Sequence, residues 1–330
     1  MSKEVKVIGI GNAIVDVISH AEDTFLDHMG IEKGIMQLVD RERAEVLYAA
    51  MSDRTEAAGG SVANTIAGLG ALGLDTAFIG KVKDDALGRF YAKSLDAAGT
   101  GFPNAPVVAA DAPTSRSMIF VSPDGERSMN TYLGAGADLN SGDVSAEVFS
   151  GGGILFLEGY LFDKDEGKSA FLEASRLMHQ AGGMSGITLS DPFCCDRHRV
   201  DFQRLVADEM DFTIGNRDEW MTLYQTDTLD AALAQASAAC ETVVCTCSGD
   251  PVIAIRGGER VEAPVTKVTP VDATGAGDQF AAGFLYGLAT GQTLETAARM
   301  GVVSGAEVVG HIGPRPAQDI KALFAKAGLI

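Results

Sequence analysis

A glycine-rich segment near the carboxyl end of the chain has the residue types of an anion-binding helix start. It reads DATGAGD at residues 272–278 and continues into a stretch with apolar residues at helical spacing. Glycines let a backbone approach a ligand closely, and the unpaired N–H groups of a helix start attract anions. Asp278 lies at this start, where a carboxylate can cap the helix or accept a proton from an attacking hydroxyl. Because a carboxylate beside an anion is a poor choice for binding alone, we expect Asp278 to be a general base.

Two further segments place polar side chains at expected helix starts. GGSVAN at residues 59–64 offers Ser61 and Asn64, which can bond the hydroxyls of a polar substrate; the alternative is an ordinary N-cap after a glycine turn. Asn216 and Glu219 lie three residues apart after a strand-like stretch, so they share one helix face. Their oxygens can hold Mg²⁺ through waters, or form a capping box, and both interpretations can hold together.

The elements that must position these residues alternate between strands and helices. The stretches 61–72 and 85–98 have helical spacing, and glycine-bounded, β-branched runs lie before, between and after them. Strands are expected at 6–18, 76–82, 154–162, 185–193, 211–216, 242–247 and 251–257. This alternation predicts an α/β fold with a parallel sheet covered by helices on both faces.

Two segments interrupt the alternation. Residues 12–40 follow the first strand, and residues 107–135 resemble two strands joined by a turn at 123–125, which reads Pro-Asp-Gly. We therefore expect a small β lid made of 12–40 and 107–135. The large α/β catalytic domain would comprise residues 1–11, 41–106 and 136–330.

Composition excludes several classes of protein. The formal net charge of -19 and the lack of a Lys/Arg cluster argue against a nucleic-acid partner. No apolar run approaches a membrane span and no signal peptide is recognisable at the start, so a cytoplasmic location without a membrane partner is expected. Five cysteines without metal-site spacing are interpreted as buried thiols.

Two nucleotide-binding motifs are incomplete. Gly9 and Gly11 follow a strand as in a dinucleotide fingerprint of NAD-dependent oxidoreductases, but the third glycine is missing. Gly167-Lys168-Ser169 is no P-loop, because Phe162 stands where the leading glycine must be. A non-catalytic sugar or nucleotide sensor would be expected to lack the base, whereas Asp278 is present.

The three motifs, in this order, resemble the PfkB-type carbohydrate kinases, also called the ribokinase-like family. The resemblance covers essentially the whole chain, through GGSVAN, GNRDE at 215–219 and DATGAGD. It implies a Rossmann-like three-layer α/β/α fold with a small β-sheet lid. It also implies ATP and Mg²⁺ as cofactors, and K⁺ as a frequent activator.

The resemblance implies a role for individual residues. Asp278 would be the catalytic base, and the amides of Gly275, Ala276 and Gly277 would form the anion hole. Asn216 and Glu219 would organise Mg²⁺ through water, and Asp272 with the carbonyl of Thr274 would bind K⁺. The remaining ATP or phosphate contacts would come from Arg127, Ser248 and Gly249.

Within the family, the chain looks closest to adenosine kinases and their bacterial relatives. The implied reaction is phosphorylation of the 5'-hydroxymethyl group of a nucleoside, adenosine first. The substrate contacts would be Asn12, Asp16, Gln37, Leu38, Gly59, Gly60, Ser61, Asn64, Met129, Leu133, Glu158 and Phe193.

Some residues depart from that subgroup. Tyr160 and Leu161 stand where adenosine kinases tend to have phenylalanines, and Glu158 resembles a sugar-binding glutamate of ribokinases. Ribokinase, fructokinase and 2-keto-3-deoxygluconate kinase therefore remain alternatives. The oligomeric state, monomer or homodimer, depends on which of them applies.

Overall fold

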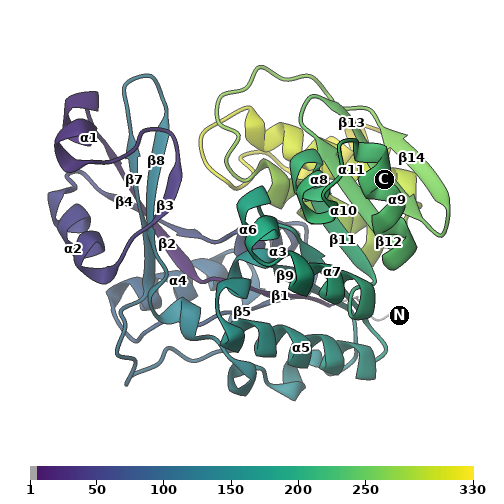
Figure 1. Cartoon of the computed structure of the whole chain (residues 1–330), viewed down its shortest axis with the longest axis horizontal. Helices are drawn as coiled ribbons and strands as arrows, with labels where there is room; N and C mark the ends of the chain where they lie inside the picture. Colours follow the sequence, from purple (N-terminus) through teal and green to yellow (C-terminus); the bar gives the residue numbers. More distant parts are fainter. Residues whose placement is uncertain (1–5) are drawn as a thin grey trace.

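The larger of two sheets has nine strands, and parallel pairing runs through most of it (Figure 1). The computed structural model describes residues 6–330. The strand order is β14-β13-β12-β11-β10-β9-β1-β5-β6, parallel from β6 to β12 and antiparallel beyond. The bounds are β1 Val7–Ile10, β5 Thr76–Ile79, β6 Thr100–Gly101, β9 Ile154–Glu158, β10 Met184–Thr188, β11 Phe212–Asn216, β12 Thr242–Cys247, β13 Asp250–Arg256 and β14 Glu259–Ala263.

Helices cover both faces of this sheet, because successive strand residues point to opposite sides. On β1, Val7 packs into one buried apolar cluster and Ile8 into another. The first cluster includes residues of α3 Ser61–Ala71, α4 Ala86–Ala97, α10 Ala276–Ala289, α11 Leu294–Val309 and α12 Ile320–Lys326. The second includes residues of α5 Asp165–Gln180, α6 Pro192–Arg197, α7 Arg199–Asp208, α8 Arg217–Tyr224 and α9 Leu229–Ala239. The expected three-layer α/β/α fold is confirmed.

Short 3₁₀ helices connect the small sheet and β9 to their neighbours. They span Gly134–Asp138, Ser141–Asp143, Ala146–Phe149 and Gly159–Asp163. The last of them begins directly where β9 ends, so the stretch expected as one strand over 154–162 turns at Gly159. A side chain at Gly159 would overlap the ring of Phe202, which explains why the turn needs glycine there.

The smaller sheet projects from the large one beside its first strands (Figure 1). Its order is β3-β8-β7-β2-β4, with β2 Ile14–His20, β3 Met36–Leu38, β4 Thr55–Gly59, β7 Ser115–Val121 and β8 Arg127–Tyr132. Two helices, α1 Asp23–Met29 and α2 Arg41–Ala50, pack on one face through Leu26 and Leu47, which join Val15, Val17 and Phe120 in the core.

The second sheet contains the two segments expected to form it and one strand more. The hairpin at 123–125 is present, with β7 and β8 antiparallel and Gly125 at a φ of 88°. Strand β4, which pairs with β2 along the sheet edge, lies in the stretch that the sequence analysis gave to the large domain. Its sequence TEAAG has neither the β-branched content nor the apolar alternation that would have indicated a strand.

Two further expectations concern membrane-spanning helices and the cysteines. Among residues 6–330, no helix is long and apolar enough to cross a membrane. All five cysteines are free and buried, as expected.

Candidate active site

A cavity of about 590 Å³ lies between the small sheet and the large one. The inner face of the small sheet lines one side. The other side is built where parallel strands end: Glu158 closes β9, Thr188 closes β10 and Asn216 closes β11. Ligands of open α/β sheets bind at this edge, because loops and helix starts converge there. The cavity size is typical of a site for small molecules.

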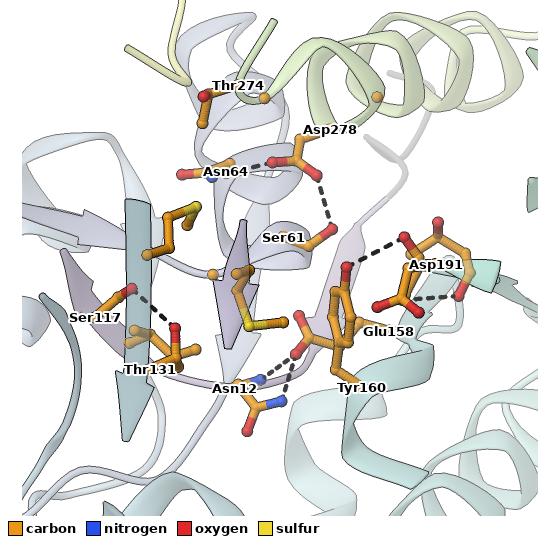
Figure 2. A pocket seen from close by; sticks show the side chains of 18 of the residues that line it. Asn12, Ser61, Asn64, Ser117, Thr131, Glu158, Tyr160, Asp191, Thr274 and Asp278 are labelled. Atoms are coloured by element: carbon orange, nitrogen blue, oxygen red, sulfur yellow. Dashed lines mark hydrogen bonds between the residues drawn. The ribbon is translucent and has the colours of Figure 1, made fainter. Parts of the chain in front are cut away.

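Asp278 lies at the third position of α10 and projects into the cavity (Figure 2). The Ser61 hydroxyl donates to one carboxylate oxygen at 2.7 Å, and the Asn64 amide donates to the other at 3.1 Å. Burial raises the pKa of Asp278 to about 6, although these two hydrogen bonds lower it. The carboxylate is therefore mostly ionised at neutral pH and is held in one orientation. Its pKa is close enough to neutral pH for it to accept a proton from a substrate.

The backbone before Asp278 has the shape that a glycine-rich anion site requires. Gly275 caps α10 with a φ of 79°, and a side chain there would overlap Pro314. Gly275 and Gly277 line the cavity. The Ala276 N–H instead donates to the Ala273 carbonyl at 3.2 Å, so Ala276 does not present its amide to the cavity here.

Asp16 extends into the cavity from β2, beneath the small sheet. Burial raises its pKa to about 6, while the charges of Arg127 and Arg315 lower it. Gly59 is required beside it, because a side chain at that position would overlap the Asp16 carboxylate. Glycine is also required at position 60. Its φ is 101°, and a side chain there would overlap the Asn12 carbonyl.

Glu158 is occupied by contacts within the protein. One of its oxygens accepts both the backbone N–H and the side-chain amide of Asn12, at 2.8 and 2.7 Å, and the other accepts the Val62 N–H at 3.2 Å (Figure 2). Burial raises its pKa to about 7, although the Asn12 and Val62 hydrogen bonds lower it. Glu158 therefore ties the end of β1 to the start of α3, which fixes Asn12 at the cavity wall.

Asn216 and Glu219 form a reciprocal capping box at the start of α8. Glu219 accepts from the Asn216 N–H and amide, both at 2.7 Å, and the Asn216 side chain accepts from the Glu219 N–H at 2.9 Å. Burial raises the pKa of Glu219 to about 7, with the Asp191 charge adding to the rise. Both residues line the cavity. Because both carboxylate oxygens already accept hydrogen bonds, the pair fits Mg²⁺ held through water better than direct ligation.

Arg127 and Asp272 form an ion pair between the small sheet and the segment that precedes α10. The guanidinium of Arg127, on β8, donates to Asp272 at 2.7 Å, and both side chains are about nine-tenths buried. Asp272 also accepts from the N–H groups of Thr274 and Gly313. Burial raises the pKa of Asp272, but hydrogen bonds from Thr274 and Gly313 and the Arg127 charge outweigh it and hold the pKa below its usual range. Both oxygens of Asp272 therefore accept hydrogen bonds within the protein, and its role as a K⁺ ligand stays a prediction.

Most of the residues expected at the site do line the cavity. They are Asn12, Asp16, Leu38, Gly60, Ser61, Asn64, Met129, Leu133, Glu158, Phe193, Asn216, Glu219, Thr274, Gly275, Gly277 and Asp278. Seven do not: Gln37, Gly59, Arg127, Ser248, Gly249, Asp272 and Ala276.

Three of these seven have simple geometric explanations. Gln37 pairs with Asn130 in the sheet register, and Met36 and Leu38 on either side point into the cavity in its place. Strand residues alternate between faces, so a position one residue away points outward. Ser248 and Gly249 form the exposed turn between β12 and β13, whereas Thr246, just before that turn, lines the cavity.

Several residues that line the cavity were not expected there from the sequence. Tyr160, Ser190, Asp191 and Arg197 come from the loops and helix that follow β9 and β10, and Ser117 and Thr131 come from the hairpin. The expected strands over 154–162 and 185–193 run past the observed ends of β9 and β10, so Tyr160, Ser190 and Asp191 fell within them and were not examined as residues that follow a strand. Ser190 follows the end of β10 at a φ of 74°, a left-handed conformation that is uncommon for a residue other than glycine and that the sequence does not indicate.

Comparisons with known proteins agree on the kind of protein. The model of the pfkB family of carbohydrate kinases matches residues 31–321. The chain is 42% identical to the solved adenosine kinase from Sinorhizobium meliloti, covering 98% of this chain and 100% of that one with a TM-score of 0.90. It is also 42% identical to a probable sugar kinase from Rhizobium etli CFN 42, covering 99% of each with a TM-score of 0.91. A 5-dehydro-2-deoxygluconokinase of Listeria monocytogenes is 28% identical over 287 residues, 82% of this chain and 87% of that protein.

Proposed function

The chain belongs to the pfkB family of carbohydrate kinases, and from this premise we propose that it is an ATP-dependent adenosine kinase. Family membership makes it a phosphotransferase that acts on a sugar or nucleoside hydroxyl. The proposed reaction converts adenosine and ATP to AMP and ADP. The observation that carries the nucleoside assignment is the composition of the cavity beneath the small sheet.

That part of the cavity combines one acidic residue with a broad apolar surface. Asp16 can accept hydrogen bonds from the hydroxyls of a ribose ring. The same cavity is lined from the small sheet and its flanks by Ile14, Met36, Leu38, Met129 and Leu133. An apolar wall of this extent suits a flat purine base, whereas a bare sugar would require more polar partners. The similarity to the Sinorhizobium meliloti adenosine kinase supports the same substrate.

Asp278 would accept the proton of the 5'-hydroxyl as that oxygen attacks the γ-phosphorus of ATP. The bond from the γ-phosphorus to the bridging oxygen breaks, and ADP leaves with that oxygen. The proton on Asp278 then passes to solvent. Ser61 and Asn64 keep the carboxylate oriented, because each holds one of its oxygens. We propose that the N–H groups of Gly277 and Asp278 in the first turn of α10, which have no partner within the helix, stabilise the charge on the transferring phosphoryl group.

The nucleotide side of the cavity has residues suited to Mg²⁺ and phosphates. Asn216 and Glu219 would hold the ion through water, with Asp191 nearby to add negative charge. When bound, Mg²⁺ would offset the charge of the phosphates. Arg197, on α6, supplies the guanidinium in the cavity lining and is proposed to contact the phosphates.

The similarity to 5-dehydro-2-deoxygluconokinases supports an acid sugar as the alternative substrate. The residues that line the cavity include five carboxylates, Asp16, Glu158, Asp191, Glu219 and Asp278, and one guanidinium. A sugar acid would add its own negative charge to this set, which is electrostatically unfavourable. Glu158, the residue expected to hold a free sugar, already accepts three hydrogen bonds from Asn12 and Val62.

The assignment can be tested by measuring ADP release with Mg-ATP in a coupled assay. The acceptors to compare are adenosine, ribose, fructose, 2-keto-3-deoxygluconate and 5-dehydro-2-deoxygluconate. Turnover of adenosine, with AMP identified as the product, would support the proposal. A higher kcat/KM for any free sugar than for adenosine would refute the substrate and leave the family assignment unchanged.

A further inference from the structure

Two hydroxyl groups face the cavity from the middle of the small sheet. Ser117 on β7 and Thr131 on β8 stand directly opposite each other in the antiparallel pair, and both line the cavity. Their hydroxyl oxygens are 2.9 Å apart and bond to each other (Figure 2). The two residues are 1% and 6% exposed, so any hydrogen-bonding capacity left over must be met inside the cavity.

This pair has one hydroxyl hydrogen to spare. Two hydroxyls carry two hydrogens, and their mutual bond uses one of them. Within residues 6–330, the Ser117 and Thr131 hydroxyls bond only to each other. A buried donor without an acceptor is unfavourable, so the spare hydrogen is positioned for a ligand atom.

A second pair of hydroxyl groups, between two threonines, provides the contrast. Thr76 and Thr100, in the large sheet, also have hydroxyl oxygens 3.0 Å apart and are buried. There the hydroxyls also reach backbone carbonyls, those of Gly99 at 3.5 Å and Ile66 at 3.3 Å. The pair in the core is thus satisfied by the protein, whereas the pair at the cavity is not.

The sheet register places the hydroxyl pair in line with Asp16. Asp16 on β2 is in register with Ser117, Ser117 with Thr131, and Thr131 with Leu38 on β3. Neighbouring strands are about 4.8 Å apart, so Ser117 and Thr131 lie roughly 5 and 10 Å from the position of Asp16 along this row. A nucleoside with its ribose at Asp16 and its base directed toward β3 would cover both hydroxyls.

The surroundings of the pair are apolar. Met129, on the same face of β8 as Thr131, and Leu133, just after β8, line the cavity beside Thr131, and Met36 and Leu38 line it from the neighbouring strand. The hydroxyl pair is therefore a polar point within an apolar wall, which is the arrangement that gives a binding pocket directional specificity.

We infer that the Ser117–Thr131 hydroxyl pair is a specificity determinant that donates a hydrogen bond to a ring nitrogen of the purine base. This inference rests on the proposed nucleoside substrate and deepens it. A free pentose at Asp16 would lie beside Ser117, one strand away, but would not extend across Thr131, so only a larger ligand covers the whole pair.

The experiment compares adenosine with 1-deaza-, 3-deaza- and 7-deazaadenosine, each of which lacks one ring nitrogen. In the wild-type enzyme, one analogue should have a kcat/KM lower than that of adenosine by about 2- to 13-fold, the range for one neutral hydrogen bond. In the double variant Ser117→Ala with Thr131→Val, adenosine and that analogue should become equal. Both hydroxyls must be removed, because either one alone could donate.

Thr76→Val is the matched control, since it removes a hydroxyl from the satisfied pair and should leave the analogue ranking unchanged. Equal kcat/KM values for all three analogues and adenosine in the wild type would overturn the inference, even if the double variant failed to fold. An analogue deficit that persists in the folded double variant would overturn it as well. If the wild type phosphorylates a sugar and not adenosine, the proposed function falls and this inference falls with it.

Discussion

Acidic pH should inactivate the enzyme through two buried aspartates. Asp278 and Asp16 each have a pKa raised to about 6, chiefly by burial, and the Asp278 charge contributes to the rise at Asp16. Each is proposed to act as an anion, one accepting the hydroxyl proton and the other accepting hydrogen bonds from ribose. For a group with a pKa of about 6, the ionised fraction falls about tenfold between pH 7 and pH 5. Two such groups predict a loss in kcat/KM of up to about a hundredfold.

The assay is the kcat/KM for adenosine between pH 5 and pH 8, at saturating Mg-ATP. The logarithm of kcat/KM should approach a slope of two below pH 6. Asp16→Asn removes one of the two titrating carboxylates, so its slope should approach one, on a lower plateau. Because ATP titrates equally with both enzymes, the difference between the two slopes isolates the protein groups.

Circular dichroism at pH 5 checks that both proteins remain folded. A wild-type profile that stays flat down to pH 5 would refute the requirement for two anions. Equal slopes in the wild type and Asp16→Asn would refute the role of Asp16 and retain that of Asp278. The two carboxylates interact, so the measured midpoints belong to the pair and not to either residue.

Three other perturbations follow from the contacts at the site. Asp278→Asn should lower kcat by about 10²- to 10⁴-fold, the usual contribution of a positioned base, while ATP binding measured by calorimetry persists; retention of a tenth of the activity would refute the role. Gly60→Ala should lower the free energy of unfolding by about 1–3 kcal/mol in urea titrations, and more than Gly258→Ala, which has a φ of 89° but open space around it; equal losses would exclude the overlap with Asn12. Arg127→Met should lower the unfolding free energy by about 1–3 kcal/mol, because the buried Asp272 loses a charged partner; an unchanged urea midpoint would show that the pair is not stabilising.

The order of the structural layers could be predicted because local signals agreed with one another. Strand-like and helical stretches alternated along the chain, and glycine-rich segments marked the starts of α3 and α10. Strand β4, which was not expected from the sequence, carries no such signal, since TEAAG has small and charged residues. It forms a strand because β2 offers it an edge to pair with, and this tertiary contact cannot be read from five residues.

Site residues that lie in a sequence motif could be predicted. Site residues whose direction depends on strand pairing were predicted less well. Ser61 and Asn64 meet Asp278 across more than 200 residues of sequence, and their motifs placed all three at the cavity. Gln37 was expected there as well, but the register of β3 turns Met36 and Leu38 inward in its place. A shift of one residue reverses the face that a strand presents, so such predictions fail by single positions.

The ion pair of Arg127 and Asp272 shows another limit. From the sequence, Arg127 was expected to contact phosphate and Asp272 was expected to bind K⁺. In the structure their opposite charges compensate each other across the boundary between the two sheets. Nothing in either local motif indicated that the two would meet, because 145 residues separate them.

The pairing within the small sheet also has a consequence for how the chain folds. β2 pairs in parallel with β7, and Ile14 meets Ser115, 101 residues later in the sequence. Loops of this length are closed slowly, since their entropy is lost before the pairing is gained. The hairpin of β7 and β8 is local and can form early. We therefore expect Asp16 to reach its place late in folding, so that a newly made chain acquires its acceptor site only after the hairpin has emerged from the ribosome.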